Sequence, residues 1–532
     1  MNDPGTLSGA WQRSVAGAAD ASFLTFEGPD GSVRQWTYGE FDVVVRRVAA
    51  HLRDRGVGRG DAVHLALTNS PTFVAVWLAT NALGAWIVPS DPMGTANELA
   101  GHLRRTAPII GFCATDRRPV YDEAASASGG RIHTISIDEA DTSLERFGTD
   151  TIGTWPDVDP LDRAAVMFTS GTTGAPKGVV ITQANYAFAG VTMASAAALT
   201  SAHRQLVVLP LFHANAQYYS FASAIAVGAS VALMHTFSAS GFVSQAARHS
   251  ATHASLFAAP IRMILQRGAT PVPGCALEHC WYAMNIADDQ YAVLSDLLGC
   301  SPRQLYGMTE TIPAVLTDRP DDPVPSSMGF VTRGCLVDVH AADGRSVEPG
   351  EIGEIVVGGT PGTTLFLEYL DDPATTAASF RDGWFLTGDR AERDALGRFT
   401  FAGRRVDVLK VAGENVSTVE VEQVLSSHPQ VLEAAVVGRS DAIRDEVPVA
   451  FVVATDPANP PSLDELMAWC NDRLTKAKRP RDIEFVDELP RTSVGKIRKF
   501  LLRDPAAESG ATSSPSPPSP SPQRETAGRS SS

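Results

Sequence analysis

The stretch that decides the fold runs from residue 167 to residue 178 and reads Met167-Phe168-Thr169-Ser170-Gly171-Thr172-Thr173-Gly174-Ala175-Pro176-Lys177-Gly178. An apolar, strand-like beginning leads into a loop of hydroxyls and glycines that ends in one lysine. Glycines let backbone amides approach phosphate oxygens, hydroxyls add donors, and the lysine supplies a positive charge. The residue order of a Walker loop is absent. The segment therefore predicts a phosphate-binding loop of another kind, against the competing interpretation of a flexible surface turn.

Around this loop the sequence predicts alternating helices and strands. Thr37 and Glu40 have the spacing of a capping box at the start of a helix, and a second helix begins near Pro71. Strands are expected at residues 62–67, 206–209 and 229–234, with a helical stretch between the last two. Alternation of this kind indicates α/β layers with mostly parallel sheets.

The character of the sequence changes after residue 336. Short strands and Gly/Pro turns fill residues 336–401, and a second organised unit starts near Arg404. In that unit two capping boxes, at Ser417 with Glu420 and at Ser462 with Glu465, predict helices. Strands are expected between these helices, at residues 431–437 and 450–453.

The predicted fold class is therefore α/β. Residues 1–403 are expected to form a large N-terminal domain of mixed sheets layered with helices, plus a small β-rich portion. Residues 404–504 are expected to form a small, mobile C-terminal α/β domain. Residues 505–532 are rich in Ser and Pro and almost without apolar residues, so they predict a disordered tail.

Composition and charge exclude some classes of partner. The 532 residues are 44% hydrophobic and 20% charged, with a formal net charge of −16. That composition is typical of a soluble globular protein. So negative a field disfavours nucleic acid and anionic membrane surfaces as partners. The longest apolar run, residues 73–88, is interrupted by polar residues and short for a bilayer span, so it predicts a buried helix leading into a strand.

The cysteines and the N-terminus favour a cytoplasmic protein. The six cysteines are spread along the chain without a dense framework, and no secretory signal is visible. Both features suit a reducing compartment. A zinc site is conceivable, although the spacing matches no standard metal pair. Its ligands would be His279, Cys275, Cys280 and Cys300.

Residues 167–178 resemble the phosphate loop of the adenylate-forming superfamily, which includes acyl-CoA synthetases, peptide-synthetase adenylation domains and firefly luciferase. Tyr306-Gly307-Met308-Thr309-Glu310-Thr311 follows in that family's order. The resemblance implies that Tyr306 lies against adenine beside Gly307, that Thr309 touches the α-phosphate, and that Glu310 is the metal ligand. A carboxylate suits that task because Mg²⁺ prefers hard oxygen ligands.

Two later segments continue the resemblance. Residues 383–389, Gly-Trp-Phe-Leu-Thr-Gly-Asp, match the family's ribose-binding segment, in which Asp389 would accept from the two hydroxyls. Residues 403–407 resemble the junction between the two domains. There Arg404 would help to hold the ribose or phosphate, and Asp407 would be the hinge.

Pro490-Arg491-Thr492-Ser493-Val494-Gly495-Lys496-Ile497 resembles the family's C-terminal catalytic loop. A carboxylate that attacks the α-phosphorus builds negative charge on the phosphoryl group and on the departing pyrophosphate. A lysine at that place stabilises the transition state more than the ground state. Lys496 is expected to take this role.

The acid-binding segment and the branch of the family are suggested by further likenesses. Residues 209–217, Leu-Pro-Leu-Phe-His-Ala-Asn-Ala-Gln, resemble the segment that lines the acid pocket, with His213 at its mouth. A buried, hydrogen-bonded structural histidine is the competing interpretation. Residues 359–362, 366–369 and 443–446 look most like the crotonobetaine/carnitine-CoA ligase branch.

The chain departs from many CoA ligases at two places. Ala412-Gly413-Glu414 stands where those relatives have Gly-Gly-Glu in the tunnel for the pantetheine arm, and residues 282–287 replace a Gly-Gly-Ala turn near the acid pocket. A methyl group on Ala412 narrows the tunnel or forbids a backbone angle that glycine takes readily. Lys410, Gly413 and Glu414 are the residues expected at the second step.

Together these features predict an ATP-dependent ligase that uses Mg²⁺ to activate a small carboxylic acid as acyl-AMP, releases pyrophosphate, and transfers the acyl group to CoA. An alternative keeps the adenylation but uses a carrier-protein thiol or an amine as acceptor, or activates nitrite for diazotisation of an aryl amine. A third possibility is a non-catalytic nucleotide-binding regulator. A homodimer is included among the expected partners.

Overall fold

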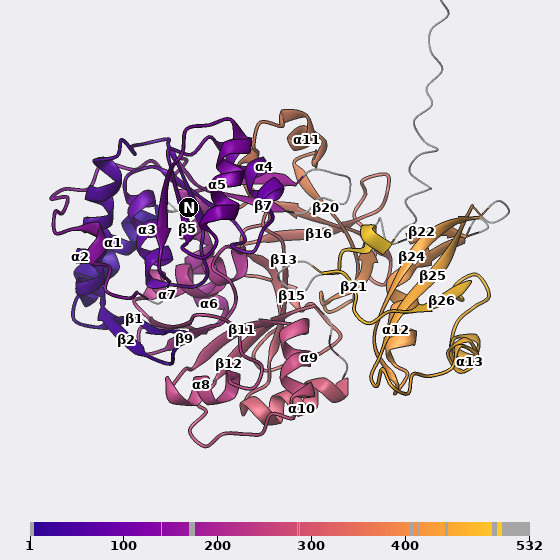
Figure 1. The fold of residues 1–532 in the computed structure, drawn as a ribbon. Helices are drawn as coiled ribbons and strands as arrows, with labels where there is room; N and C mark the ends of the chain where they lie inside the picture. Colours follow the sequence, from indigo (N-terminus) through magenta and orange to yellow (C-terminus); the bar gives the residue numbers. More distant parts are fainter. Residues whose placement is uncertain are drawn as a thin grey trace, which may run out of the picture. The chain divides into compact units, whose positions relative to one another are not determined.

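The computed structural model describes residues 5–139, 141–169, 176–284, 286, 288–404, 408–411, 414–441, 445–491 and 497–502. These residues form two compact units. The first unit comprises the described residues up to Arg404 together with Arg491, and the second comprises those from Val408 to Pro490 and 497–502. Both units mix helices and strands, so the predicted α/β class is confirmed (Figure 1).

The phosphate-loop segment belongs to a seven-stranded sheet in the order β18-β8-β7-β4-β3-β5-β6. Its strands are β3 (Ala62–Ala66), β4 (Trp86–Pro89), β5 (Ile110–Ala114), β6 (His133–Ile137), β7 (Arg163–Thr169), β8 (Lys177–Thr182) and β18 (Glu368–Tyr369). The pairs from β6 to β7 are parallel, whereas β7–β8 and β8–β18 are antiparallel. The chain therefore reverses at the predicted phosphate loop.

The apolar run from residue 73 forms the buried helix and strand that the sequence predicts. Helix α3 (Pro71–Ala82) is buried along its whole length. The Ser70 hydroxyl caps it by accepting from the Phe73 amide at 3.2 Å. Strand β4 follows directly. Among the described residues, no helix combines the length and apolar character that crossing a membrane requires.

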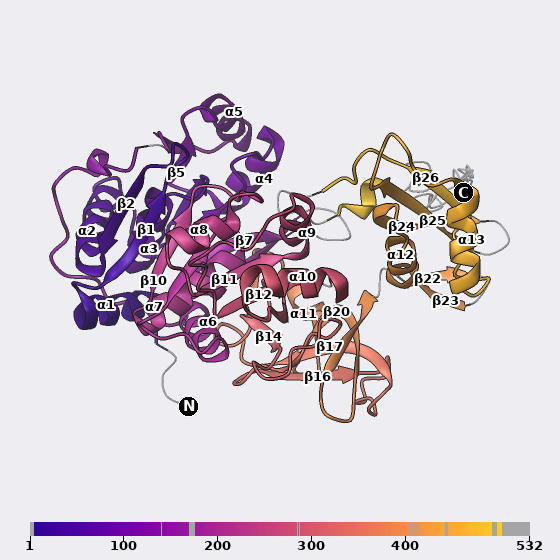
Figure 2. The ribbon, with the colours of Figure 1, turned by 90° about the horizontal axis from the view of Figure 1, so that it is seen from below.

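A nine-stranded sheet forms the other large layer of the first unit, in the order β15-β14-β13-β12-β11-β9-β10-β1-β2. Its strands are β1 (Ser22–Glu27), β2 (Val33–Thr37), β9 (Arg204–Val207), β10 (Ser230–Met234), β11 (His253–Phe257), β12 (His279–Ala283), β13 (Arg303–Gly307), β14 (Ala314–Thr317) and β15 (Phe330–Val331). Strands β10 to β13 run parallel. Helices α8 (Phe242–Arg248), α9 (Ala258–Gln266) and α10 (Asp288–Leu298) pack on β11 and β12 around one apolar cluster (Figures 1 and 2).

The remaining helices of the first unit cover these sheets. They are α1 (Leu7–Ala18), α2 (Tyr38–Arg53), α4 (Ala96–Thr106), α5 (Arg118–Ser128), α6 (Gln183–Ala196), α7 (Ser223–Val227) and α11 (Pro373–Ala378). Short 3₁₀ turns lie at Glu145–Phe147 in this unit and at Lys499–Leu502 in the second unit. The helical stretch expected after residue 209 is a π-helix, η2 (Asn215–Ala222), followed by α7.

A smaller sheet accounts for the β-rich stretch predicted from residue 336 (Figure 2). It contains β16 (Leu336–His340), β17 (Ile352–Gly358), β19 (Phe380–Arg381), β20 (Trp384–Arg393) and β21 (Phe399–Arg404), all antiparallel.

The second unit is a sheet with helices α12 (Thr418–Ser426) and α13 (Leu463–Arg473) packed on one apolar cluster. Its strands are β22 (Val408–Val411), β23 (Glu414–Ser417), β24 (Val431–Asp441), β25 (Asp445–Ala454) and β26 (Asp482–Phe485). The expected strands at 431–437 and 450–453 are the two longest of this sheet and pair with each other. The predicted tail, 505–532, lies outside the described residues.

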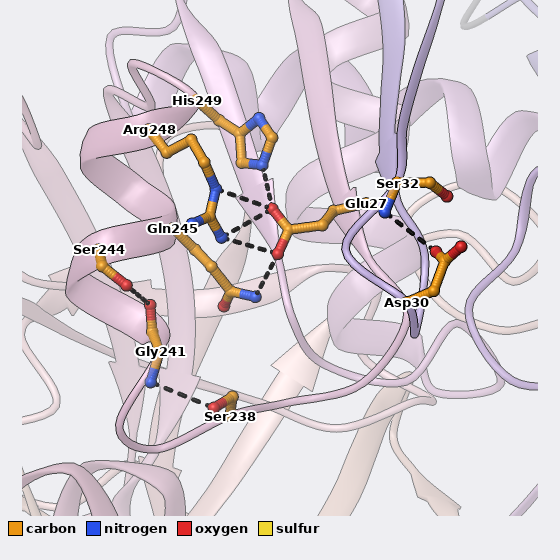
Figure 3. A network of polar contacts seen from close by, with 9 residues as sticks. All are labelled: Glu27, Asp30, Ser32, Ser238, Gly241, Ser244, Gln245, Arg248 and His249. Carbon is orange, nitrogen blue, oxygen red and sulfur yellow. Dashed lines mark hydrogen bonds and ion pairs between the residues drawn. The ribbon is translucent and has the colours of Figure 1, made fainter.

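A polar network ties the end of β1 to α8 (Figure 3). The Glu27 carboxylate accepts from His249 Nε2 at 2.6 Å, from Arg248 Nη2 at 2.7 Å and from Gln245 Nε2 at 3.3 Å. Burial raises the pKa of Glu27, but the hydrogen bonds from His249 and Arg248 outweigh burial and lower it. The network therefore favours an ionised carboxylate that joins two distant segments.

Candidate active site

Strands β7 and β8 bring the two ends of the phosphate loop together. Thr169 at the end of β7 lies opposite Lys177 at the start of β8. A Cβ on Gly178 would come within 3.1 Å of Leu370 and Val166 side-chain atoms, so glycine permits the close packing of this hairpin. The loop residues Ser170, Gly171, Thr172, Thr173 and Gly174 lie outside the described residues.

Lys177 borders a pocket of about 340 Å³. The pocket is also lined by Arg105, Tyr369 and Asp372. Arg105 donates to the backbone oxygens of Pro176 at 2.6 Å and of Leu370 at 2.9 Å. The guanidinium thus joins the residue that precedes Lys177 to the residue that follows Tyr369.

Glu310 is held by two groups from the turn before α11. Tyr369 donates its hydroxyl to Glu310 Oε1 at 3.0 Å, and the Phe366 amide donates to the Glu310 backbone oxygen at 2.9 Å. The Glu310 side chain is buried, with 4% of the residue exposed. Burial, reinforced by the nearby Glu310 carboxylate, raises the pKa of Tyr369 well above its usual range, so the phenol remains a donor.

Tyr306 and Asp389, predicted from motifs far apart in the sequence, meet in the structure. The Tyr306 hydroxyl donates to Asp389 Oδ2 at 2.8 Å. The Asp389 amide donates to Thr387 Oγ1 at 3.1 Å, and this hydroxyl donates to the Ile355 oxygen at 2.7 Å. Arg404 at the end of β21 lies opposite Asp389 in the ladder. The residues expected to bind adenine and ribose are thus neighbours in the structure.

The hexapeptide that contains Glu310 is a strand end followed by a tight turn. Gly307 ends β13, and a Cβ there would come within 2.8 Å of the Pro313 oxygen and 3.3 Å of the Tyr219 hydroxyl. The Met308 amide donates to Thr311 Oγ1 at 3.0 Å, which fixes the turn that carries Thr309. Thr309 is half-buried.

The residues present fit a magnesium ion. The Glu310 carboxylate and the neighbouring Thr309 hydroxyl are hard oxygen donors, and the carboxylate is already oriented by Tyr369. The residues considered for a zinc site are less suited to a metal, because His279 Nδ1 already accepts from Arg303 Nη2 at 2.6 Å and from Arg303 Nε at 2.8 Å. In the described part of the chain, no group of three or more His, Cys, Asp or Glu side chains is arranged to hold a metal.

The segment that resembles an acid-pocket lining carries buried polar atoms without hydrogen-bond partners among the described residues. They are His213 Nε2 and both amide atoms of Asn215, and the Tyr218 hydroxyl, directly after the segment, is in the same state. Burial lowers the pKa of His213 to about 4, so the ring is neutral near pH 7. The competing interpretation of His213 required a hydrogen-bonded structural histidine, and its buried Nε2 has no such bond within the described part.

Asn215 and Tyr218 stand in the π-helix η2, beside a set of large buried rings. Tyr186 lies 5.5 Å from both Trp77 and Tyr218, and Trp77 lies 6.0 Å from Phe221, measured between ring centroids. Gln217 is different from Asn215, because its amide donates to the Leu211 oxygen at 2.6 Å and its oxygen accepts from Tyr186.

Residues 282–287, one of the two departures from relatives, contain a backbone outlier. Met284 follows β12 directly and has a φ of 73°, a conformation that costs a non-glycine residue energy. Its side chain lies at the surface, with 57% of the residue exposed. Asn285 and Ala287 lie outside the described residues.

Other predicted residues fall wholly or partly outside the described part of the chain. Lys496, Asp407 and Gly413 lie outside the described residues, and of Lys410 and Glu414 only the backbone is described, in β22 and β23. Tyr369 and Arg105 were not predicted as site residues, and Asn215 was predicted only as a member of the segment 209–217. The only sequence signal for Tyr369 was its place in residues 366–369, which marked a branch of the family but no role.

Known protein families match the chain over most of its length. The sequence profile of the AMP-binding enzyme family matches residues 11–370, and that of the AMP-binding enzyme C-terminal domain matches residues 420–496. A crotonobetaine/carnitine–CoA ligase of Salmonella choleraesuis (strain SC-B67) is 33% identical over 506 residues, which cover 93% of this chain and 98% of that protein.

Solved structures are similar over the same span. An anthranilate CoA ligase in complex with anthranoyl-AMP has a TM-score of 0.85 and 26% identity, with 93% of this chain and 96% of that chain covered. The o-succinylbenzoate CoA synthetase of Bacillus subtilis, in complex with its acyl-adenylate intermediate, has a TM-score of 0.82 and 27% identity, with 93% and 98% covered.

Proposed function

The chain belongs to the AMP-binding enzyme family and is similar to AMP-forming acid–CoA ligases over most of its length, and from this premise we propose that it activates a small, polar acid and transfers it to CoA. The observation that carries the proposal is Asn215, whose carboxamide is buried with neither atom hydrogen-bonded among the described residues.

In the proposed first half-reaction, a carboxylate oxygen of the acid attacks the α-phosphorus of ATP. The P–O bond to pyrophosphate breaks, and acyl-AMP forms. Tyr306 and Asp389, joined by their hydrogen bond, bind adenine and ribose, with Arg404 beside them in the ladder. Thr169 and Lys177 flank the loop that holds the phosphates. Lys496 stabilises the charge that develops on the phosphoryl group and on pyrophosphate.

Glu310 would hold Mg²⁺, with Thr309 as a neighbouring oxygen. When bound there, the ion would offset the negative charge of the phosphates. The chain's own contribution is the position of the carboxylate, which Tyr369 and Phe366 fix from the side chain and the backbone.

In the proposed second half-reaction, the thiol of CoA attacks the carbonyl carbon of acyl-AMP and AMP leaves. The C-terminal domain, 404–504, turns about Asp407 so that Lys496 withdraws and residues 410–414 approach the acyl group. Lys410, Gly413 and Glu414 are the residues that this step would use. Such rotations let one enzyme assemble two sites in sequence.

The acid is proposed to be compact because of the side chains within and next to residues 209–217. Leaving a buried donor or acceptor unpaired costs about 1–3 kcal/mol, so a cluster of such atoms is retained when a ligand uses it. His213, Asn215 and Tyr218 supply such atoms within a short stretch of sequence. The rings of Trp77, Tyr186, Tyr218 and Phe221 pack against one another beside these atoms, which favours a compact acid over a long apolar chain.

The same observation favours a second candidate, in which the compact acid is nitrite and the acceptor is an aryl amine. A carrier-protein thiol or another amine as acceptor also remains a prediction, because Ala412 lies outside the described residues. Nitrite offers only oxygen and nitrogen atoms to the site, so it needs polar partners and no apolar pocket.

The test is pyrophosphate release from ATP and Mg²⁺ across a panel of acids, each with and without CoA. The panel contains short hydroxy, keto and amino acids, fatty acids of increasing length, and nitrite. Turnover of a short polar acid that rises with CoA supports the proposal. Preference for a long fatty acid would refute the compact, polar acid. Turnover with nitrite and an aryl amine alone would select the second candidate.

A further inference from the structure

Tyr369 contacts two groups of opposite charge that come from distant parts of the sequence. Its hydroxyl donates to Glu310 Oε1 at 3.0 Å, and the Lys177 ammonium lies 4.7 Å from the centroid of its ring. A phenol can make both contacts at once, because the face of the ring attracts a cation while the hydroxyl donates to an anion.

The backbone around Tyr369 makes this position rigid. Strand β18 pairs with β8, so that Tyr369 lies opposite Val179, two residues beyond Lys177. The Leu370 amide donates to the Gly178 oxygen at 2.7 Å, and the Tyr369 amide donates to Thr376 Oγ1 at 2.9 Å. Tyr369 is buried, with 4% of the residue exposed.

Aromatic rings pack against the turn that carries Tyr369. The Phe366 ring lies 4.8 Å from the Tyr369 ring and 5.4 Å from the Phe385 ring. Since the Phe366 amide also donates to the Glu310 backbone oxygen, one short turn holds Glu310 through both its side chain and its backbone.

We propose that Tyr369 is a positioning residue for adenylation, which joins the lysine at the end of the phosphate loop to the carboxylate that receives the metal. The hydroxyl fixes one oxygen of Glu310, and the ring fixes the ammonium of Lys177. The phosphate-binding cation and the metal-binding anion are thereby held at a set distance before ATP arrives. This inference rests on the proposed function, because it takes Glu310 as the metal ligand.

Two substitutions at Tyr369 separate its contacts. Tyr369→Phe removes the hydroxyl and keeps the ring, whereas Tyr369→Leu removes both. Tyr121→Phe is the matched control. It also removes a buried hydroxyl, which lies 2.9 Å from His64 Nδ1 and belongs to α5, a helix that carries none of the predicted ATP residues. All variants are compared as the full chain, with thermal unfolding as a check on folding.

The readout is ATP binding by calorimetry, titrated at a series of Mg²⁺ concentrations, with no acid present. For Tyr369→Phe we expect the Mg²⁺ concentration that gives half-maximal ATP affinity to rise about tenfold, because removal of a group that orients a metal ligand typically costs at least that factor. Metal-free ATP binding should stay unchanged. Tyr369→Leu should weaken metal-free ATP binding as well, and Tyr121→Phe should change neither.

A double-mutant cycle tests the ring. If the ring positions Lys177, then Lys177→Met and Tyr369→Leu should each raise the Kd for metal-free ATP. The Kd of the double variant should then exceed the higher of the two single-variant Kd values by less than twofold. Effects that multiply would mean that the two side chains act independently and would overturn the inference.

The outcomes distinguish this inference from the proposed function. If the wild-type chain binds no ATP, the proposed function itself fails. If the wild type binds ATP with Mg²⁺ and Tyr369→Phe has the same Mg²⁺ dependence as Tyr121→Phe, the positioning role of the hydroxyl is wrong while the proposed function stands.

Discussion

At the scale of single residues, Asn215 shows how a binding site can be recognised by buried polar atoms that destabilise the folded state. Both polar atoms of its amide are buried without partners among the described residues, whereas Gln217, two positions later, has both of its amide groups hydrogen-bonded. The two amides stand in the same π-helix. π-helical turns are rare and occur frequently at functional sites. We therefore expect Asn215 to lower the stability of the fold while it contributes to activity.

We expect Asn215→Leu to leave the free energy of unfolding unchanged or to raise it by about 1 kcal/mol, because it removes an unpaired buried amide. Adenylation of the acid should fall by about a hundredfold or more, since the acid loses its polar partner. Gln217→Met is the control, and it should lower the free energy of unfolding by about 1–3 kcal/mol by leaving its partners unpaired. Urea unfolding and pyrophosphate release provide the two measurements. A clear loss of stability in Asn215→Leu with normal turnover would contradict the assignment.

Lys496 is a second residue whose role is specific to one step. Lys496→Ala should abolish formation of acyl-AMP, because the charge that develops on pyrophosphate loses its partner. Thioester formation from supplied acyl-AMP and CoA should remain largely intact. Rapid-quench assays of the two half-reactions make the comparison. Equal loss in both would refute a role limited to the first step.

At the scale of elements, helix starts were the features most readily predicted. Thr37 and Ser462 each accept from the amide three residues later, and Glu40 and Glu465 reach back to complete the capping boxes. At α12, Ser417 accepts from the Glu420 amide as expected. These patterns are local, so a few adjacent residues suffice to define them. The sequence predicted a helical stretch at η2, but no local pattern indicated its π-helical hydrogen bonding.

The same difference separates the predicted and unpredicted parts of the site. Tyr306 and Asp389 each lie in a recognisable motif, and the structure joins them across 83 residues. Tyr369 contacts Glu310 across 59 residues and Lys177 across β8 and β18. Neither contact leaves a pattern in the sequence, because strand β18 is only two residues long. Pairing of this kind needs the fold.

The network of Glu27 allows an element-scale prediction. Glu27→Gln should lower the free energy of unfolding by about 1–3 kcal/mol, because the buried ring of His249 and the guanidinium of Arg248 lose a charged acceptor. Asp30→Asn changes an exposed carboxylate in the turn after β1 and should have a clearly smaller effect. Urea unfolding of both variants checks this. Equal effects would mean that the network does not hold α8 to β1.

At the scale of the whole molecule, buried histidines make stability depend on pH. Burial lowers the pKa of His64 to about 3, and burial likewise lowers that of His102 and of His253 to about 4. In the unfolded chain these rings titrate near 6.5. Between these values the unfolded state binds protons that the folded state does not. Stability should therefore be complete above about pH 6.5 and should fall as the pH falls.

His64→Gln isolates one of these contributions. Burial raises the pKa of Asp318 to about 7, so protonation of this carboxyl stabilises the folded state as the pH falls. This opposite contribution is the same in wild type and variant and cancels in the comparison. From pH 7.5 to pH 5.5, the wild type should lose about 1.4 kcal/mol more of its free energy of unfolding than the variant. Urea unfolding at the two pH values measures the difference. Parallel losses would show that His64 is protonated in the folded state.

The measurement that tests the central claim most directly follows an oxygen atom. The chain is incubated with ATP, Mg²⁺, CoA and the carboxylic acid found active in the panel, with ¹⁸O in its carboxylate. If nitrite is the active acid, nitrite carries the label and an aryl amine replaces CoA. Attack of that oxygen on the α-phosphorus, followed by departure of AMP, leaves one labelled oxygen in AMP. Mass spectrometry should therefore find ¹⁸O in AMP and none in pyrophosphate. Labelled pyrophosphate or labelled free phosphate would contradict adenylate formation.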